Sequence, residues 1–195
     1  MSARIAFLRH GPTAWNQERR LQGMKDVPLS DEGRALVAGW HVTLPGWRWV
    51  CSPLMRARET ASLIGAPPSL AIEPALREMA YGEWEGRTLA ELRRSAPAQM
   101  QAAETRGMDM APPGGESPRQ VMDRLRPWIE GVAERGENVL AVTHKGVIRV
   151  VLAMATGWDM KSRQPVKLEW NCLHVFAAED DGTVRVEDLN RTVTA

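Results

Sequence analysis

The sequence has few residues that form crosslinks or bind metals. Among its 195 residues there are two cysteines and four histidines. Cys51 and Cys172 lie in apolar, strand-like stretches, so we expect two buried free thiols rather than a disulfide or a reactive thiol. Neither the cysteines nor the histidines have metal-ligand spacing such as His-x-x-x-His. We therefore predict neither a fold stabilised by disulfide bonds nor a metal site.

Long apolar runs and a strong net charge are also absent. No uninterrupted apolar stretch is long enough to cross a bilayer, and the opening residues MSARIAFLRH lack the apolar run and cleavage site of a signal peptide. The formal net charge is only +1, so no overall positive field draws the chain to nucleic acid or to an anionic membrane. We expect a cytoplasmic protein with neither kind of partner, in which any positive charge used in function is local.

The apolar content is enough for one core. Hydrophobic residues make up 44% of the chain, and a single domain over residues 1–195 is the expectation at this length. No internal repeat, low-complexity segment or linker divides the sequence.

Short apolar runs alternate with helix signals along the chain. Strands are predicted at 4–8, 47–51, 70–73, 138–143, 173–178 and 183–187. Helices are predicted at 31–44, 53–65, from Thr88 onward, within 96–116, at 117–136 and at 147–157. This alternation predicts a three-layer α/β/α sandwich with a mainly parallel central sheet. In such folds ligands bind at the carboxyl ends of the strands.

Two histidines follow predicted buried strands at those ends. Arg9 and His10 come directly after the strand at 4–8, and His144 follows the strand at 138–143, just before a predicted helix. Arginine presents a planar donor fork to phosphate oxygens, and histidine can act as nucleophile, donor or proton carrier. The helix after His144 would add backbone N–H groups that favour an anion. These residue types indicate a phosphate site.

Arg56 and Glu78 extend this pattern. Arg56 offers a second guanidinium, and Glu78 a carboxyl group for general acid–base work. Phosphoryl transfer depends mostly on positioning and charge neutralisation, which two arginines can supply. We therefore expect an enzyme that needs neither a metal nor another cofactor.

Four ordered blocks make the sequence similar to a known family. They are FLRHGPTAWN (7–16), SPLMRARETA (52–61), LREMAYGEWEG (76–86) and VTHKGVIR (142–149). They resemble the motifs of the histidine phosphatase superfamily, the phosphoglycerate mutase-like proteins. LQGMKDVPLSDEGR and PPGGES match further blocks of that family, and the resemblance runs in order to about residue 152.

The resemblance implies a role for each matching residue. It makes His10 the nucleophile that attacks phosphorus. It makes Arg9, Arg56 and His144 the groups that bind the phosphoryl oxygens. It makes Glu78 the acid that protonates the leaving oxygen and later activates water. From the residues themselves, His10 must be neutral to attack, and neighbouring arginines should disfavour its protonation.

Four further residues belong to the expected substrate site. The resemblance places Asn16 close to the phosphate, and Gln22 and Gly23 match the family's glutamine-glycine pair. Lys145 stands where the family often has glycine. It would either add positive charge near the leaving group or point into solvent.

Several residues have less specific interpretations. Glu83 and Glu85 compete with Glu78 for the acid role, but we expect them to be solvated or structural. His41, on the predicted 31–44 helix, and His174, inside a strand, belong to no motif and are expected to be structural.

The leading functional hypothesis is a phosphomonoesterase for a small phosphorylated metabolite. One alternative is a cofactor-dependent phosphoglycerate mutase, but the short interval between the Glu78 block and PPGGES favours hydrolysis in an open pocket. Another is a catalytically inactive protein that binds a phosphorylated ligand. The sequence does not identify the substrate, and a homodimer stays open because no interface is visible in the sequence.

Overall fold

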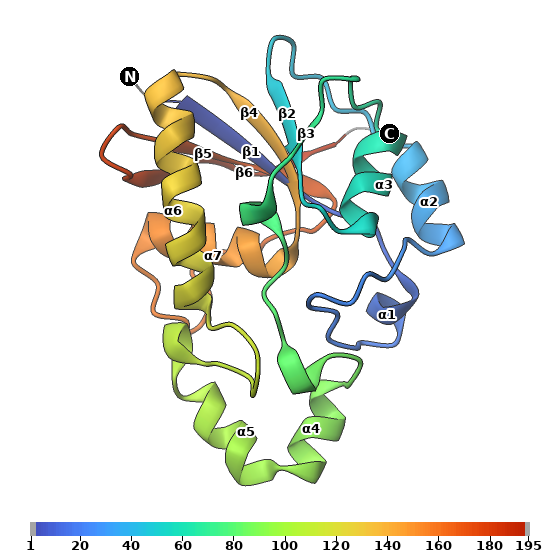
Figure 1. The fold of residues 1–195 in the computed structure, drawn as a ribbon, viewed down its shortest axis with the longest axis vertical. Coiled ribbons are helices and arrows are strands. Elements are labelled where there is room, and N and C mark those ends of the chain that lie inside the picture. Colours follow the sequence, from blue (N-terminus) through green and yellow to red (C-terminus); the bar gives the residue numbers. More distant parts are fainter. Residues whose placement is uncertain (1–2, 194–195) are drawn as a thin grey trace.

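A six-stranded mixed sheet forms the centre of the computed structural model, which describes residues 3–193 (Figure 1). The strand order is β3-β2-β4-β1-β5-β6. The first four strands in this order run parallel, whereas β5 and β6 pair antiparallel. The strands are Ala3–Arg9 (β1), Arg48–Cys51 (β2), Ala71–Ile72 (β3), Val139–Thr143 (β4), Cys172–Ala178 (β5) and Val184–Thr192 (β6). The predicted α/β sandwich with a mainly parallel sheet is confirmed.

Helices cover both faces of the sheet. They are Ala14–Gln17 (α1), Asp31–Ala38 (α2), Met55–Leu63 (α3), Leu89–Ser95 (α4), Pro97–Glu104 (α5), Pro118–Arg135 (α6) and Lys145–Thr156 (α7). Successive residues of β1 alternate between two clusters: Ile5 and Phe7 pack with α6 and α7, and Ala6 and Leu8 pack with the α2 side. This period-2 alternation places one helical layer on each face of the sheet.

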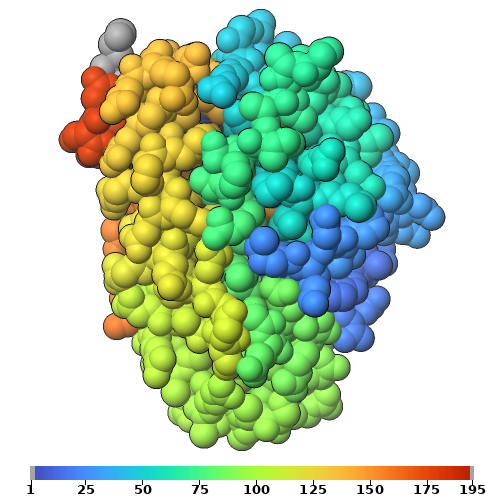
Figure 2. Space-filling view, viewed as in Figure 1, coloured from blue at the N-terminus to red at the C-terminus, as the bar shows by residue number. Residues whose placement is uncertain are grey.

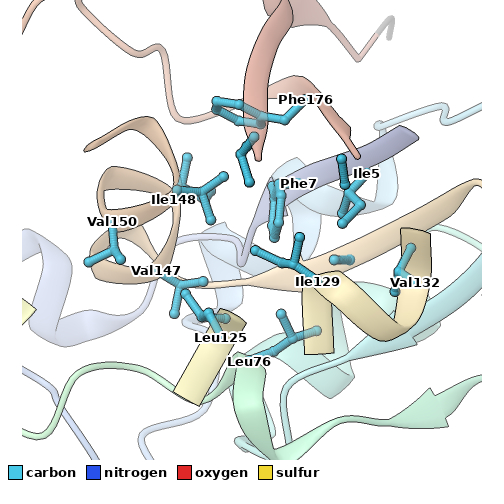
Figure 3. Packing of buried hydrophobic residues seen from close by; sticks show 14 of the residues in the cluster. Ile5, Phe7, Leu76, Leu125, Ile129, Val132, Val147, Ile148, Val150 and Phe176 are labelled. Carbon is cyan, nitrogen blue, oxygen red and sulfur yellow. The ribbon is translucent and has the colours of Figure 1, made fainter. Parts of the chain in front are cut away.

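The larger cluster is built around an aromatic pair. The rings of Phe7 and Phe176 meet edge to face with centroids 5.8 Å apart, and Ile129 of α6 and Ile148 of α7 lie on the same side (Figure 3). α6 begins with a capping box between Ser117 and Gln120, and Pro118 is its first residue.

The helix predicted at 31–44 is too long. α2 ends at Ala38, and Gly39 is its C-cap. Trp40 and Leu44 are buried, but a loop rather than a helix carries them, and Leu36 is 49% exposed. Glycine is a poor helix former, and Gly39 ends the helix although the apolar spacing continues beyond it. His41 therefore lies outside the helix, on the surface.

A small helical subdomain projects beyond the carboxyl edge of the sheet. We call residues 89–110, with α4, α5 and a short 3-10 helix, the cap. The cap forms the lower end of the molecule in Figures 1 and 2. Leu92, Met100 and Ala103 of the cap form an apolar cluster with Trp84. Within residues 3–193 no helix is long and apolar enough to span a bilayer.

Candidate active site

The carboxyl ends of three neighbouring strands meet at one point. The backbone N–H of His10 donates to Thr143 O over 2.9 Å, and that of Ser52 donates to Val142 O over 2.9 Å. These bonds continue the β1–β4 and β2–β4 pairings past the ends of the strands. As a result the rings of His10 and His144 lie side by side, with centroids 5.2 Å apart.

The environment of His10 determines both its charge and its tautomer. Its Nδ1 lies 2.7 Å from Gly11 O. A carbonyl oxygen can only accept, so Nδ1 carries the ring proton and Nε2 keeps its lone pair. Burial, followed by the charges of Arg9 and Arg56, holds the pKa of His10 well below its ordinary value. His10 is therefore a neutral imidazole with an unprotonated Nε2, as expected from the neighbouring arginines.

Two backbone carbonyls fix the position of the Arg56 guanidinium. Its side chain is fully buried on α3, and its two Nη atoms donate to Lys25 O over 2.9 Å and to Gly23 O over 2.8 Å. Gly23 has a φ of +53°, and a Cβ there would lie 2.0 Å from a Glu85 carboxyl oxygen. Gly23 thus orients Arg56 through its carbonyl and is not among the residues that line the pocket, and its expected contact with the substrate stays a prediction.

Both arginines keep an unpaired donor. The Nε atoms of Arg9 and Arg56 are buried and have no hydrogen-bond partner in the described chain. The Arg9 guanidinium also packs 5.4 Å from the centroid of the Trp170 ring. A buried unpaired donor is costly, so both donors are suited to an anion that binds in the pocket.

His144 is anchored by a residue that the sequence did not single out. Its Nε2 lies 2.6 Å from Ser52 Oγ, and Ser52 Oγ accepts a hydrogen bond from Leu54 N at 3.3 Å. Ser52-Pro53 is a sequence typical of a helix N-terminus, but α3 begins only at Met55 and its N-cap makes no side-chain bond. Burial, then the charge of Arg56, lowers the pKa of His144 well below its ordinary value, so this ring is neutral too.

Glu78 enters the site from the segment after β3. One carboxyl oxygen accepts from Met79 N at 2.8 Å and the other from Gly146 N at 3.3 Å. Gly146 lies in the first turn of α7, where an anion is favoured. Glu78 is 7% exposed and lines the same pocket as His10.

An ion pair between Arg124 and Glu116 supports the segment that carries Glu78. Arg124 of α6 donates to the carbonyls of Ala75, Arg77 and Glu78 and to Glu116 at 3.1 Å. Glu116 belongs to the PPGGES block, but no sequence pattern pointed to Arg124 as its partner.

The two competing carboxylates lie elsewhere. Glu83 is exposed. Glu85 accepts from Met24 N at 2.8 Å and from Tyr81 N at 3.1 Å. Neither lines the pocket, so the expectation that the two are solvated or structural is confirmed.

The pocket that these residues share has a volume of about 520 Å³. Asn16, Gln22 and Lys145 line it as expected, and Tyr81 and Arg149 line it although no role was predicted for them. Glu78 is the only carboxylate among its lining residues, against six cations: Arg9, Arg19, Arg20, Arg56, Lys145 and Arg149. The pocket is therefore strongly basic although the whole chain is nearly neutral.

The two cysteines and His174 lie outside the pocket. Cys51 and Cys172 are free and buried, which confirms the expected thiols. His174 is fully buried in β5 and accepts from Asn190 N at 3.4 Å, which fits its expected structural role. Within residues 3–193, no three His, Cys, Asp or Glu side chains are grouped so that they could hold a metal ion.

An α/β sandwich with a basic pocket at the carboxyl edge of its parallel strands is suited to binding phosphorylated small molecules. The family comparison agrees with this class. Residues 5–192 match the Histidine phosphatase superfamily (branch 1), and the chain belongs to that superfamily.

The relatives include both phosphatases and mutases. The chain is 33% identical over 168 residues to glucosyl-3-phosphoglycerate phosphatase of Mycolicibacterium vanbaalenii, covering 79% of this chain and 74% of the relative. It is 31% identical over 193 residues to 2,3-bisphosphoglycerate-dependent phosphoglycerate mutase 2 of Gloeobacter violaceus, covering 93% and 88%. The solved structure of Bacillus stearothermophilus YhfR matches with a TM-score of 0.81, 29% identity and 98% coverage of both chains.

Proposed function

We propose that this protein is a phosphomonoesterase that hydrolyses a small phosphorylated metabolite through a phosphohistidine at His10. The observation that supports this most is the hydrogen bond from His10 Nδ1 to Gly11 O. It leaves a neutral Nε2 as the free nitrogen, beside guanidinium groups suited to phosphoryl oxygens.

The reaction takes two steps. In the first, His10 Nε2 attacks phosphorus, the phosphorus–oxygen bond to the leaving group breaks, and Glu78 gives its proton to the leaving oxygen. Arg9, Arg56 and His144 stabilise the charge on the transferring group. In the second, Glu78 takes a proton from water, the water oxygen bonds to phosphorus, and the phosphorus–nitrogen bond breaks. Phosphate leaves, and His10 and Glu78 return to their starting states.

The phosphoglycerate mutase reaction is the competing proposal. It would use the same phosphohistidine but return the phosphoryl group to a second hydroxyl, and a mutase among the relatives supports it. The short cap favours water as the acceptor, because only residues 87–111 lie between the block that contains Glu78 (76–86) and the PPGGES block (112–117). A catalytically inactive binding protein would have no need for a carboxylate beside the histidine pair.

Two assays on the purified protein test the proposal. The first measures release of inorganic phosphate from 4-nitrophenyl phosphate and from a panel of phosphorylated metabolites. The second follows conversion of 3-phosphoglycerate to 2-phosphoglycerate with 2,3-bisphosphoglycerate present. We expect phosphate release without mutase turnover. Mutase turnover that exceeds phosphate release would reverse the choice, and no turnover in either assay would indicate a binding protein.

A further inference from the structure

A second basic surface adjoins the catalytic pocket. We call it the basic groove; its volume is about 780 Å³. It is formed by the start of α7 and by the segment between α7 and β5. Its lining residues include four cations and no carboxylate: Lys145, Arg149, Arg163 and Lys167. Lys145, Arg149 and Trp170 line both the basic groove and the catalytic pocket, so the two are continuous.

Trp170 joins the two sites physically. The Arg9 guanidinium lies 5.4 Å from the centroid of its ring, and Lys145 Nζ lies 5.2 Å from it. Arg9 lines the catalytic pocket but not the groove, whereas Lys145 lines both. A ligand held by Arg9 at its phosphoryl end would therefore have Lys145 within reach of its other end.

Most of the positive charge in the groove is not neutralised. Lys167 pairs with Glu169 at 2.6 Å. Within residues 3–193, Lys145, Arg149 and Arg163 have no carboxylate within ion-pair distance. The Nε of Arg149 is also buried without a hydrogen-bond partner. Desolvation, then the charges of Arg9 and Arg149, lowers the pKa of Lys145. Cations gathered in this way repel one another, and an anion placed among them would relieve that repulsion.

We propose that the substrate carries a second anionic group on its leaving-group side, and that Lys145, Arg149 and Arg163 bind it in the basic groove. This proposal rests on the phosphatase function proposed above. It defines the substrate class as a small phosphomonoester with a second anionic group, either a carboxylate or another phosphate.

An apolar pocket on the cap side is the competing place for the leaving group. Its volume is about 390 Å³, and its lining includes Met79, Met100, Met110 and Met160. It also opens beside Tyr81 and Arg149. A leaving group held there would be apolar, so the two pockets predict opposite substrate preferences.

A matched series of three-carbon phosphate esters separates the two. The probes are propyl phosphate, 3-phosphooxypropanoate, propane-1,3-diol bisphosphate and 3-aminopropyl phosphate. We expect kcat/KM for the carboxylate or the bisphosphate to exceed that for propyl phosphate by about tenfold or more, as for a hydrogen bond to a charged group. The aminopropyl ester should be the poorest substrate. The anionic probe with the higher kcat/KM shows whether the second group is a carboxylate or a phosphate.

Arg163→Met connects this preference to the groove, because Arg163 lines the groove but not the catalytic pocket. The variant should lower the ratio of anionic to propyl kcat/KM by about tenfold. Arg126→Met, at an exposed arginine on α6 outside both pockets, is the matched control and should leave the ratio unchanged. Equal kcat/KM for propyl and anionic esters, or an unchanged ratio in Arg163→Met, would overturn the proposal.

A wrong phosphatase proposal would give a different result from a wrong groove proposal. The enzyme would then turn over neither 4-nitrophenyl phosphate nor any probe. Calorimetric binding of the same four probes would still test the groove: the anionic probes should bind most tightly, with the difference lost in Arg163→Met. Equal affinities would overturn the groove proposal in that case as well.

Discussion

The carboxyl edge of the sheet (the edge) and the cap form different walls of one pocket, and different interactions stabilise the two walls. At the edge, Arg56 and His144 are fully buried and hydrogen-bonded to groups on other segments. In the cap, Met100 and Leu92 pack in a small apolar cluster, and Arg93 pairs with Glu104 at the surface, where such pairs stabilise little.

This difference separates chemistry from specificity. Groups that bind a transferring phosphoryl group need fixed geometry, which buried hydrogen bonds supply. Methionine side chains adapt their shape and tolerate change, so a cap built from them can vary without disturbing the edge. We infer that the edge determines the reaction and that the cap and the basic groove determine which ester reacts.

The largest effect is expected at the nucleophile. His10→Ala removes the nitrogen that would bond to phosphorus, so turnover of every substrate should fall by about 10⁴-fold or more. Steady-state phosphate release from 4-nitrophenyl phosphate is the measurement. His41→Ala, at an exposed histidine outside the site, is the control and should keep full activity. Near wild-type activity in His10→Ala would exclude it as the nucleophile.

Glu78→Gln should be the next most damaging change, and its effect should depend on the substrate. Alkyl phosphates, whose leaving oxygen needs a proton, should lose about 10²- to 10⁴-fold in kcat/KM. Aryl phosphates should lose much less, because a phenolate leaves without a proton. Glu83→Gln is the matched control.

An equal loss on both substrate types would assign Glu78 a structural role. The acid would then have to be sought at another carboxylate by the same leaving-group comparison.

The buried histidines of the sheet should make stability depend on pH. Burial lowers the pKa of His174 to about 4, and the pKa values of His10 and His144 are lowered as well. A histidine with a lowered folded pKa takes up protons preferentially in the unfolded state. The free energy of unfolding should therefore fall as the pH drops below about 6.5 and level off below the folded pKa.

His174 alone should contribute about 2 kcal/mol of this loss between pH 7 and pH 5. Urea unfolding of the wild type and of His174→Gln at both pH values measures it, and the variant should lose less stability than the wild type over that interval. Met100→Ala, in the cap, should lower stability by a similar amount at both values. The same pH dependence in His174→Gln as in the wild type would contradict the assignment.

The smallest effect is expected from chelation. In the proposed mechanism Arg9 and Arg56 supply the positive charge for the phosphoryl group, so activity should survive exhaustive EDTA treatment with less than about a twofold change. Loss of activity that Mg²⁺, Mn²⁺ or Zn²⁺ specifically restores would show that the arginines are not sufficient.

Local sequence signals predicted the residues at the strand ends. Arg9, His10 and His144 could be located because a buried strand followed by a polar residue fixes where that residue lies, and the family motifs assigned Arg56 and Glu78. Neutral His10 also followed from its neighbours. The alternation of strands and helices was enough to predict the sandwich.

Contacts between distant segments could not be predicted. Ser52 is 92 residues from His144, and its Ser-Pro sequence looked like a helix cap. Arg124 supports Glu78 from 46 residues away, and Gly23 acts through its backbone on Arg56. The end of α2 at Ala38 was missed because Leu36, Trp40 and Leu44 have helical spacing, although Leu36 is exposed and a loop carries the other two.

Trapping the phosphoenzyme tests the central claim most directly. The protein would be mixed with excess substrate, quenched in alkaline denaturant to preserve an acid-labile phosphoramidate, and mapped by mass spectrometry. We predict a single phosphoryl group on His10, absent from His10→Ala. A phosphoryl group on His144 that forms in His10→Ala and is lost in His144→Ala would contradict the account.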